Sequence, residues 1–226
     1  MRRALPVIGG GLLLAVIVAT EAWAQSSEAE RYNADIVASH LTVEGTSTLH
    51  NWVVEGKNVG GYLIFHENEL ASLWTTSGPL SQPLAPAVHV EIPVASLTSG
   101  KRGMDEKMHE ALKATTHPLI TYRLESAQHA VHHAAQADDG SGDLTIETKG
   151  VLTVAGVERL MDIPMRVRRL PENRLEISGD TSVRMTEFGI EPPRVMLGTL
   201  RTGNAVRVRW TWVLARDRID DNRDAQ

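Results

Sequence analysis

The chain of 226 residues contains no cysteine. A protein without thiols has no disulfide framework, no cysteine metal ligand and no cysteine for lipid attachment, so burial of side chains must stabilise it. The sequence also lacks G-x-S-x-G, H-E-x-x-H, a phosphate-binding glycine loop and a dinucleotide fingerprint after a strand. These absences argue against the common hydrolases, metalloproteases and nucleotide-dependent enzymes. We therefore predict a protein that is not an enzyme and that needs no cofactor.

One pair of residues offers an alternative to this prediction. Ser47 and His50 lie three positions apart and have the chemistry of a nucleophile and a base. Serines in turns and histidines in strands more often form ordinary hydrogen bonds, so the hydrolase interpretation is the weaker one.

An excess of positive charge is also missing. The 28 Asp and Glu residues outnumber the 23 Lys and Arg residues, and the formal net charge is −5. A mildly acidic protein lacks the basic surface that nucleic acids require, so we expect no nucleic-acid partner.

The two ends of the chain differ in character from its middle. Residues 1–24 combine Arg2 and Arg3 with an apolar stretch and the small residues Ala22 and Ala24, which together indicate a cleaved secretory signal peptide. An uncleaved membrane anchor is less favoured, because the apolar stretch is short and contains glycines. We expect a polar leader over residues 25–33, a domain over 34–216, a charged tail over 217–226 and a periplasmic location.

Alternating polar and apolar residues dominate the stretch 150–193. Met161, Ile163, Met165 and Val167 share one parity, and polar residues occupy the other. The segment 174–185 alternates in the same way, after a predicted turn at 171–173. Side chains of a strand point to opposite faces at period two, so each segment has one apolar face. Such a sheet must pack on a second sheet or close on itself.

Further strands are predicted on both sides of this stretch. They lie at 34–44, 49–54, 62–65, 88–94, 120–124 and 206–214, with loops at 77–86 and 127–142. Pro93 marks a strand end, edge or bulge, since proline cannot donate to a ladder. The fold class is therefore all-β and antiparallel.

One segment changes to a helical period. Between Gly103 and Thr116, Met104, Met108 and Leu112 recur at the spacing of one helix face, and charged residues fill the other face. We predict an amphipathic helix that ends before His117-Pro118. It covers an opening of the barrel, either packed there as a simple lid or in contact with a ligand as well.

Three motifs in order give the sequence a family resemblance. They are H-P-x-I-x-Y-x-x-x-S at 117–126, G-x-L-T-x-x-G-V at 150–157 and S-V-R-M-T-E-F-G-I at 182–190. Together they resemble the YceI-like family of exported, lipocalin-like barrels that bind polyisoprenoids, over residues 34–214. The resemblance implies an eight-stranded antiparallel barrel whose lumen holds a long isoprenoid chain, of the quinone or polyprenyl phosphate type, and it implies a homodimer. A lipid-binding protein is also expected to make transient contact with a membrane, and its role would be carriage, storage or stress protection.

The parity of the strands predicts which side chains would line such a lumen. An eight-stranded barrel is about the size that holds one slender ligand or fills with its own side chains. The expected lumen and lid residues are Leu49, Trp52, Val90, Ile92, Met104, Met108, Leu112, Tyr122, Leu124, Leu152, Ile163, Met165, Ile177, Val183, Phe188, Trp210 and Trp212. We expect Phe188 to plug one end, and His50, Arg102 and Arg123 to lie nearest the mouth, where they would meet a ligand's head group.

A periplasmic metal-binding protein is the alternative from another class. His129, His132 and His133 have the i, i+3, i+4 spacing that places three imidazoles on one helical face. Histidine-rich loops are usually only solvated, so lipid binding is favoured and no metal site is expected.

Overall fold

The computed structural model of the protein describes residues 29–66, 69, 74, 86–129, 143–195 and 200–217. The expected signal peptide, His132, His133 and most of the charged tail lie outside these residues. The strands are β1 Ala29–Ala34, β2 His40–Ser47, β3 Trp52–Gly56, β4 Gly60–His66, β5 Ala87–Pro93, β6 Leu97–Thr98, β7 Leu119–His129, β8 Leu144–Val154, β9 Val157–Leu170, β10 Arg174–Arg184, β11 Arg194–Val195 and β12 Leu200–Arg216. The helix α2 spans Arg102–Ala111, and the short 3-10 helices η1 and η2 span Val94–Ser96 and Met185–Phe188.

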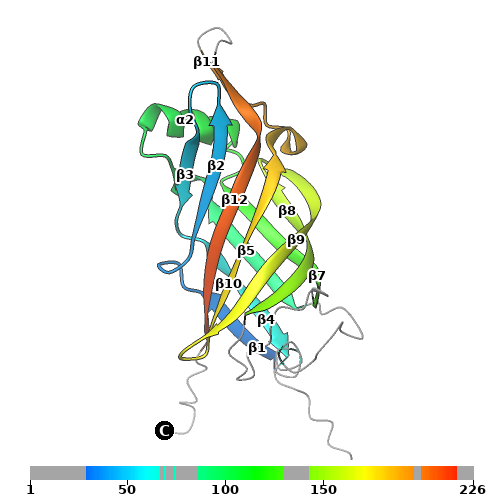
Figure 1. The fold of residues 1–226 in the computed structure, drawn as a ribbon. Coiled ribbons are helices and arrows are strands. Elements are labelled where there is room, and N and C mark those ends of the chain that lie inside the picture. The colour runs from blue at the N-terminus through cyan, green and yellow to red at the C-terminus, as the bar shows by residue number, and fades with distance from the viewer. Residues whose placement is uncertain are drawn as a thin grey trace, which may run out of the picture.

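Eight strands form a closed antiparallel barrel (Figure 1). The pairing runs β1, β4, β5, β7, β8, β9, β10 and β12, and β12 then pairs with β1 to complete the ring. The closing contact joins Tyr32, Asn33 and Ala34 to the last residues of β12. The expected fold class and closed barrel are confirmed.

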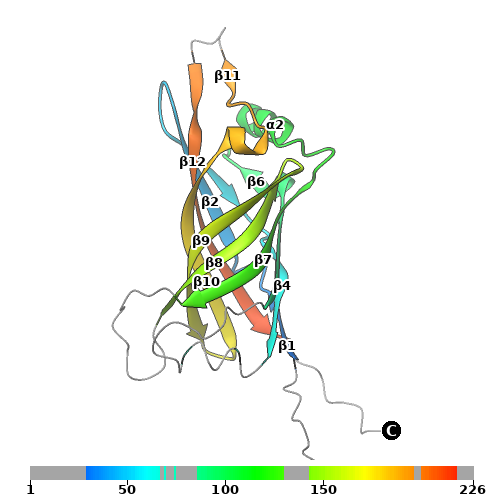
Figure 2. The ribbon, with the colours of Figure 1, turned by 90° about the vertical axis from the view of Figure 1, so that its right-hand side faces the viewer.

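A second group of strands extends the barrel at the end where α2 lies (Figure 2). The long strand β12 pairs with β1 near its C-terminus and with β2 along its earlier part. From β2 the sheet continues through β3 to β6, which follows β5 after the single turn η1. We call the end with α2 and η2 the upper end and the end with β1 the lower end.

The hairpins that build the wall follow the sequence pattern closely. β9 and β10 are joined at residues 171–173, where Glu172 and Asn173 have φ of 62° and 55°. Two successive positive φ values give the turn a twist that matches the strands it connects. β5 ends at Pro93, as a residue without an N–H predicts, and Gly189 closes η2 in the left-handed region.

Several boundaries differ from the predictions. The segment predicted as one strand at 34–44 contains the end of β1, a turn and the first part of β2, and β12 begins at Leu200 instead of at residue 206. Three further differences have a clear physical cause. The expected polar leader contains β1, a strand missed because Tyr32 is its only large apolar residue and the alternation is therefore weak. β7 extends to His129, into the segment predicted as a loop, because pairing with β8 sustains a polar strand. The helix ends at Ala111 and continues as turns to residue 116, with Lys113 at φ 54°.

The apolar core lies inside the barrel and divides into two clusters. The larger contains buried residues from most strands, among them Leu63, Phe65, Trp212 and Leu214. The smaller lies at the upper end, where Phe188 packs with Ala155 and Ile190. Within the described residues, no helix has the length and apolar character needed to cross a membrane.

Candidate binding cavity

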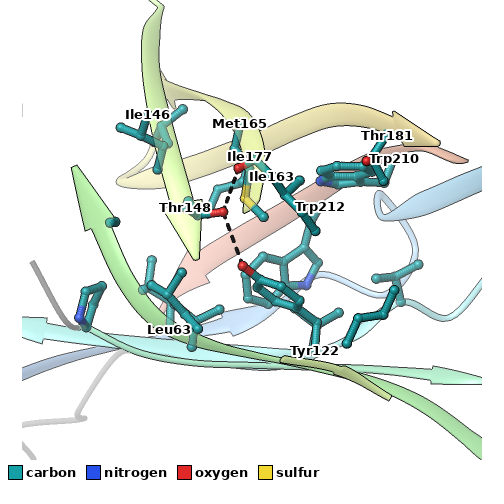
Figure 3. A pocket seen from close by; sticks show the side chains of 18 of the residues that line it. Leu63, Tyr122, Ile146, Thr148, Ile163, Met165, Ile177, Thr181, Trp210 and Trp212 are labelled. Carbon is teal, nitrogen blue, oxygen red and sulfur yellow. Dashed lines mark hydrogen bonds between the residues drawn. The ribbon is translucent and has the colours of Figure 1, made fainter. Parts of the chain in front are cut away.

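The lumen of the barrel contains an elongated cavity of about 180 Å³ (Figure 3). Its wall consists of residues from seven of the eight barrel strands, all except β1, together with Leu41, Val59, Glu69 and Pro86. Nearly all the atoms that line it are apolar, because alternate positions of the strands carry Val, Ile, Leu, Met and Trp. We call this space the lower cavity.

A short chain of hydrogen bonds crosses the wall of the lower cavity. The Tyr122 hydroxyl lies 3.2 Å from Oγ1 of Thr148, which donates to the carbonyl oxygen of Ile163 at 2.6 Å (Figure 3). Because the Thr148 hydroxyl donates its only hydrogen to the carbonyl, it must accept from Tyr122, and Tyr122 is the donor between the two hydroxyls. Burial raises the pKa of Tyr122, so this phenol stays neutral.

The buried indole of Trp212 supplies a polar atom that this chain does not use. Among the described residues, its Nε1 has no hydrogen-bond partner, although the side chain is only 3% exposed and lines the lower cavity. A buried donor without a partner costs about 1–3 kcal/mol. An acceptor atom of a ligand, or a water, would satisfy it.

A second cavity of about 640 Å³ lies above the first, beneath α2. Both cavities are lined by Leu41, Ile92, Leu152, Val183 and Val208, so they are neighbours that share part of their walls. The upper cavity is bounded by α2, by β2 and β3, and by η2. Its volume falls within the ~300–1,000 Å³ usual for ligand sites.

The apolar face of α2 borders this space. Met104, Met108 and Leu112 line the upper cavity, and no residue of the helix is buried. An amphipathic helix that served only to cover a packed core would bury this face. Met104, Met108 and Leu112 pack against the core only in part, and their remaining surface faces the cavity.

Polar contacts hold α2 over the cavity at its first turn. The Asp105 carboxylate accepts hydrogen bonds from the Ser99 N–H at 2.7 Å, the Ser99 hydroxyl at 2.6 Å and the Thr98 hydroxyl at 2.9 Å. These donors, those of Ser99 first, lower the pKa of Asp105. One turn later, the His109 ring donates through Nε2 to the carbonyl of Leu97 at 2.9 Å.

Trp52 lines the upper cavity, and its ring packs on Gly45 of β2. The two residues face each other across the β2–β3 pair, and the Trp52 ring covers Gly45 so closely that a Cβ there would lie 2.1 Å from it. The indole N–H donates to the carbonyl of Thr46 at 3.2 Å. Gly45 is thus required for Trp52 to lie flat against the strand.

The structure brings together the residues that parity placed in the lumen. Of these, Val90, Tyr122, Leu124, Ile163, Met165, Ile177, Trp210 and Trp212 line the lower cavity, Leu49, Trp52, Met104, Met108, Leu112 and Phe188 line the upper cavity, and Ile92, Leu152 and Val183 line both. Phe188 is buried at the upper end of the barrel, where an end plug was expected.

The three expected head-group residues do not lie at one site. His50 lines the upper cavity. The Arg102 side chain is 93% exposed and pairs with Glu106, while the Arg123 side chain is 61% exposed and pairs with Glu125 on the outer surface. Neither arginine lines a cavity, because Arg123 neighbours the inward-facing Tyr122 on β7 and Arg102 precedes the apolar face of α2. Lys107 and Arg201 line the upper cavity instead.

The Ser47 and His50 pair lies within the described residues, whereas the histidine cluster does so only in part. The Ser47 hydroxyl donates to the backbone carbonyl of His50 at 2.8 Å, so this pair builds a turn and does not pair a nucleophile with an imidazole. His129 ends β7, whereas His132 and His133 lie outside the described residues. Within the described part, no group of three or more His, Asp and Glu side chains could hold a metal ion.

Sequence reasoning missed part of the wall. Leu63 and Phe65 on β4, Val88 on β5, Thr148 on β8 and Val208 on β12 all line a cavity. Val88 and Val208 have the same parity as the residues chosen on their strands, so the pattern contained their signal. The stretch 62–65 has no polar alternation, and only its pairing with β1 and β5 reveals its inner face.

Comparisons with known proteins agree with this architecture. The family model described as "YceI-like domain" matches residues 32–214. The crystal structure of Burkholderia cenocepacia BcnA is similar with a TM-score of 0.59 and 15% identity, covering 80% of this chain and 98% of that one. A structure titled as a polyisoprenoid binding domain from Saccharophagus degradans, implicated in plant cell wall breakdown, has a TM-score of 0.59 and 15% identity and covers 82% and 98%. The comparison with curated proteins found no match.

Proposed function

The chain belongs to the YceI-like family, and from this premise we propose that it binds one long isoprenoid lipid in the lumen of its barrel. The observation that carries the proposal is the pair of adjacent apolar cavities, one inside the barrel and one beneath α2, which share five wall residues. A slender chain would lie lengthwise in the lower cavity and continue under the helix. The structural neighbour titled as a polyisoprenoid binding domain adds support.

Burial of the chain is a sufficient driving force. Each methylene removed from water contributes ~0.8 kcal/mol, so about twenty of them contribute on the order of 16 kcal/mol before the entropy cost of binding is subtracted. Such a ligand needs no covalent chemistry from the protein. A protein that carries, stores or shields the lipid meets these requirements.

The head group belongs at the upper end in this proposal. The upper cavity is lined by His50, Lys107 and Arg201, and no carboxylate side chain of the described residues lines it. Cations and an imidazole can hydrogen-bond to a quinone carbonyl or a phosphate. Both lipid types are therefore included, and the binding experiment distinguishes them.

Tryptophan fluorescence tests the proposal directly. Trp210 and Trp212 line the lower cavity and Trp52 lines the upper one, so lipid that enters should change their emission. We expect titration with undecaprenyl phosphate or with long-chain ubiquinone to saturate at one lipid per chain. A flat titration with both lipids would contradict the proposal. If the titration saturates, organic extraction and mass spectrometry of the protein purified from its own cells would identify the natural lipid.

We further propose that the protein acts after export, as a periplasmic protein that starts near Gln25. The support is the charged, apolar and small-residue order of residues 1–24. The intact mass of the exported protein should correspond to the chain without residues 1–24. A mass that corresponds to the full chain would contradict cleavage. We also propose that the protein forms a homodimer, which analytical sedimentation tests. Transient contact with a membrane is the last part of the proposal, and flotation with lipid vesicles tests it.

A further inference from the structure

The wall of the barrel divides between β9 and β10. These strands pair only from Arg174↔Leu170 to Ser178↔Arg166. Beyond that point β10 stays paired with β12 up to Arg184, and β9 stays paired with β8 up to Val157. In Figure 1 the two strands leave their shared turn side by side and separate toward the upper end.

Pro164 explains where the pairing stops. The register would next place it opposite Asp180, two residues beyond the last hydrogen-bonded pair. The ladder from β9 to β8 continues through Pro164 without a shift in register, so its missing N–H affects the β10 side. Proline within a barrel strand is tolerated at an edge, and this half of β9 is such an edge.

A groove lies on the outside of the barrel at this division. It has a volume of about 600 Å³ and is lined by Pro164 and Arg166 from β9 and by Ser178, Gly179 and Asp180 from β10. Met165 and Trp210 line both this groove and the lower cavity. These two side chains are therefore shared by the wall of the lumen and the outer surface.

Gly179 lies at the division between the Trp210 ring and the backbone of Pro164. The Trp210 ring lies over Gly179, where a Cβ would be 2.6 Å from the ring and 3.0 Å from the carbonyl oxygen of Pro164. A larger residue at position 179 would fill this space with fixed atoms. As it is, rotation of Trp210 and of the flexible Met165 side chain would open a path into the lumen.

We propose that the division between β9 and β10 is a lateral entrance to the lumen, through which the chain of an isoprenoid lipid enters and leaves. This inference rests on the proposed function. A long chain that enters sideways does not have to be threaded lengthwise past α2. Trp210 and Met165 are the gate.

The groove outside the entrance would hold the polar end of such a lipid during entry, before the head group reaches its final place at the upper end. His40, Arg166 and Arg209 line it together with several hydroxyl groups. Its one carboxylate, Asp180, is paired with Arg207, and Arg209 is paired with Glu44. Arg166 forms no ion pair within the described part of the chain. A phosphate or another acceptor-rich head group is the class that these donors attract.

A covalent link across the entrance tests the inference. Asp162→Cys with Ser182→Cys places exposed thiols on the two strands beyond Pro164, in a protein with no other cysteine. Joining them with a short bifunctional thiol reagent should slow exchange of bound undecaprenyl phosphate, or of long-chain ubiquinone, at least about tenfold. The matched control is Arg168→Cys with Glu176→Cys, which links the same strands where they are already paired. Its exchange rate should stay unchanged.

The outcomes separate this inference from the proposed function. If the linked protein binds lipid and exchanges it as fast as the control, the lateral entrance is wrong and the lumen site stands. If neither lipid binds to the unmodified protein, the proposed function itself fails. Should the cysteine pair prevent folding, Pro164→Val tests the same point, since the restored N–H lets the ladder extend toward Asp180. Slower exchange is then expected, and an unchanged rate overturns the inference.

Discussion

The hydroxyl of Tyr122 on β7 donates to the hydroxyl of Thr148 on the neighbouring strand β8, 3.2 Å away inside the lumen. Thr148 in turn donates to the carbonyl of Ile163 on β9. Three adjacent strands are thus joined on their inner face by side-chain hydrogen bonds. The two hydroxyls are buried, so each depends on this chain for a partner.

The two ends of this chain should respond differently to mutation. Tyr122→Phe removes the first donor and leaves Thr148 bonded to Ile163, so we expect a loss of about 1 kcal/mol in the free energy of unfolding. Thr148→Val leaves the Tyr122 hydroxyl buried without a partner, which costs ~1–3 kcal/mol. Urea unfolding of both variants measures the difference. Adding Tyr122→Phe to Thr148→Val should recover part of the loss, and purely additive effects would contradict the proposed chain.

The clamp at Asp105 predicts an acid-sensitive lid. Its pKa is lowered in the folded protein, so its contribution to stability is present above the ordinary value of 3.8 and is lost as the pH falls through the folded-state pKa. Asp105→Asn should loosen α2 at neutral pH, seen as faster amide exchange in the helix. Glu106→Gln changes the charge equally on the exposed face and should leave exchange unchanged. If amide exchange in α2 were equally fast in both variants, Asp105 would not hold the helix in place.

A charge on the inner face of α2 should affect binding more than folding. Met108→Glu places a carboxylate against the upper cavity, which costs several kcal/mol once lipid closes the site and little while the face is hydrated. We expect at least about a tenfold loss of affinity with a nearly unchanged melting temperature. Thr115→Glu, on an exposed turn of the same segment, is the control. Retention of lipid by a folded Met108→Glu protein would show that the helix is only a cover.

The basic residues separate the two lipid classes. Lys107 lines the upper cavity, whereas Arg102, five residues earlier on the same helix, does not. An exposed ion pair is worth up to ~1 kcal/mol, so Lys107→Gln should weaken undecaprenyl phosphate binding by up to about fivefold. Long-chain ubiquinone carries no charge and should be affected less. Arg102→Gln should leave both affinities unchanged. If Arg102→Gln and Lys107→Gln weakened undecaprenyl phosphate binding equally, the head group would lie elsewhere.

The faces of the strands were predictable because alternation at period two is a local property. Leu152, Ile177 and Trp210 share inward parity with their neighbours, and all three line a cavity. The same rule, applied to Arg123, would have shown that this residue follows the inward-facing Tyr122 and points outward, contrary to its predicted place near the mouth. Its expected place near the mouth came from its charge, which says nothing about its face.

Features that depend on pairing between distant strands were not predictable. β1 has one large inward residue, Tyr32, and is a strand because β4 and β12 supply hydrogen-bond partners on both sides. The division of the wall has a local cause in Pro164, but its effect requires knowing that β10 is the neighbour on that side. The extent of the cavity beneath α2 likewise depends on where β2, β3 and η2 meet.

The pairing of β1 with β12 has a consequence for the order of folding. Tyr32 pairs with Arg216, so the ring joins residues at opposite ends of the described chain. Contacts of such large sequence separation are formed slowly, because a long loop must close before they stabilise anything. A nascent chain that has not yet released Arg216 can form the hairpins from β7 to β10 but cannot seal the barrel. Closure is thus a late event, and until then the unpaired edges of β1 and β12 are open to a chaperone or to a second unfolded chain.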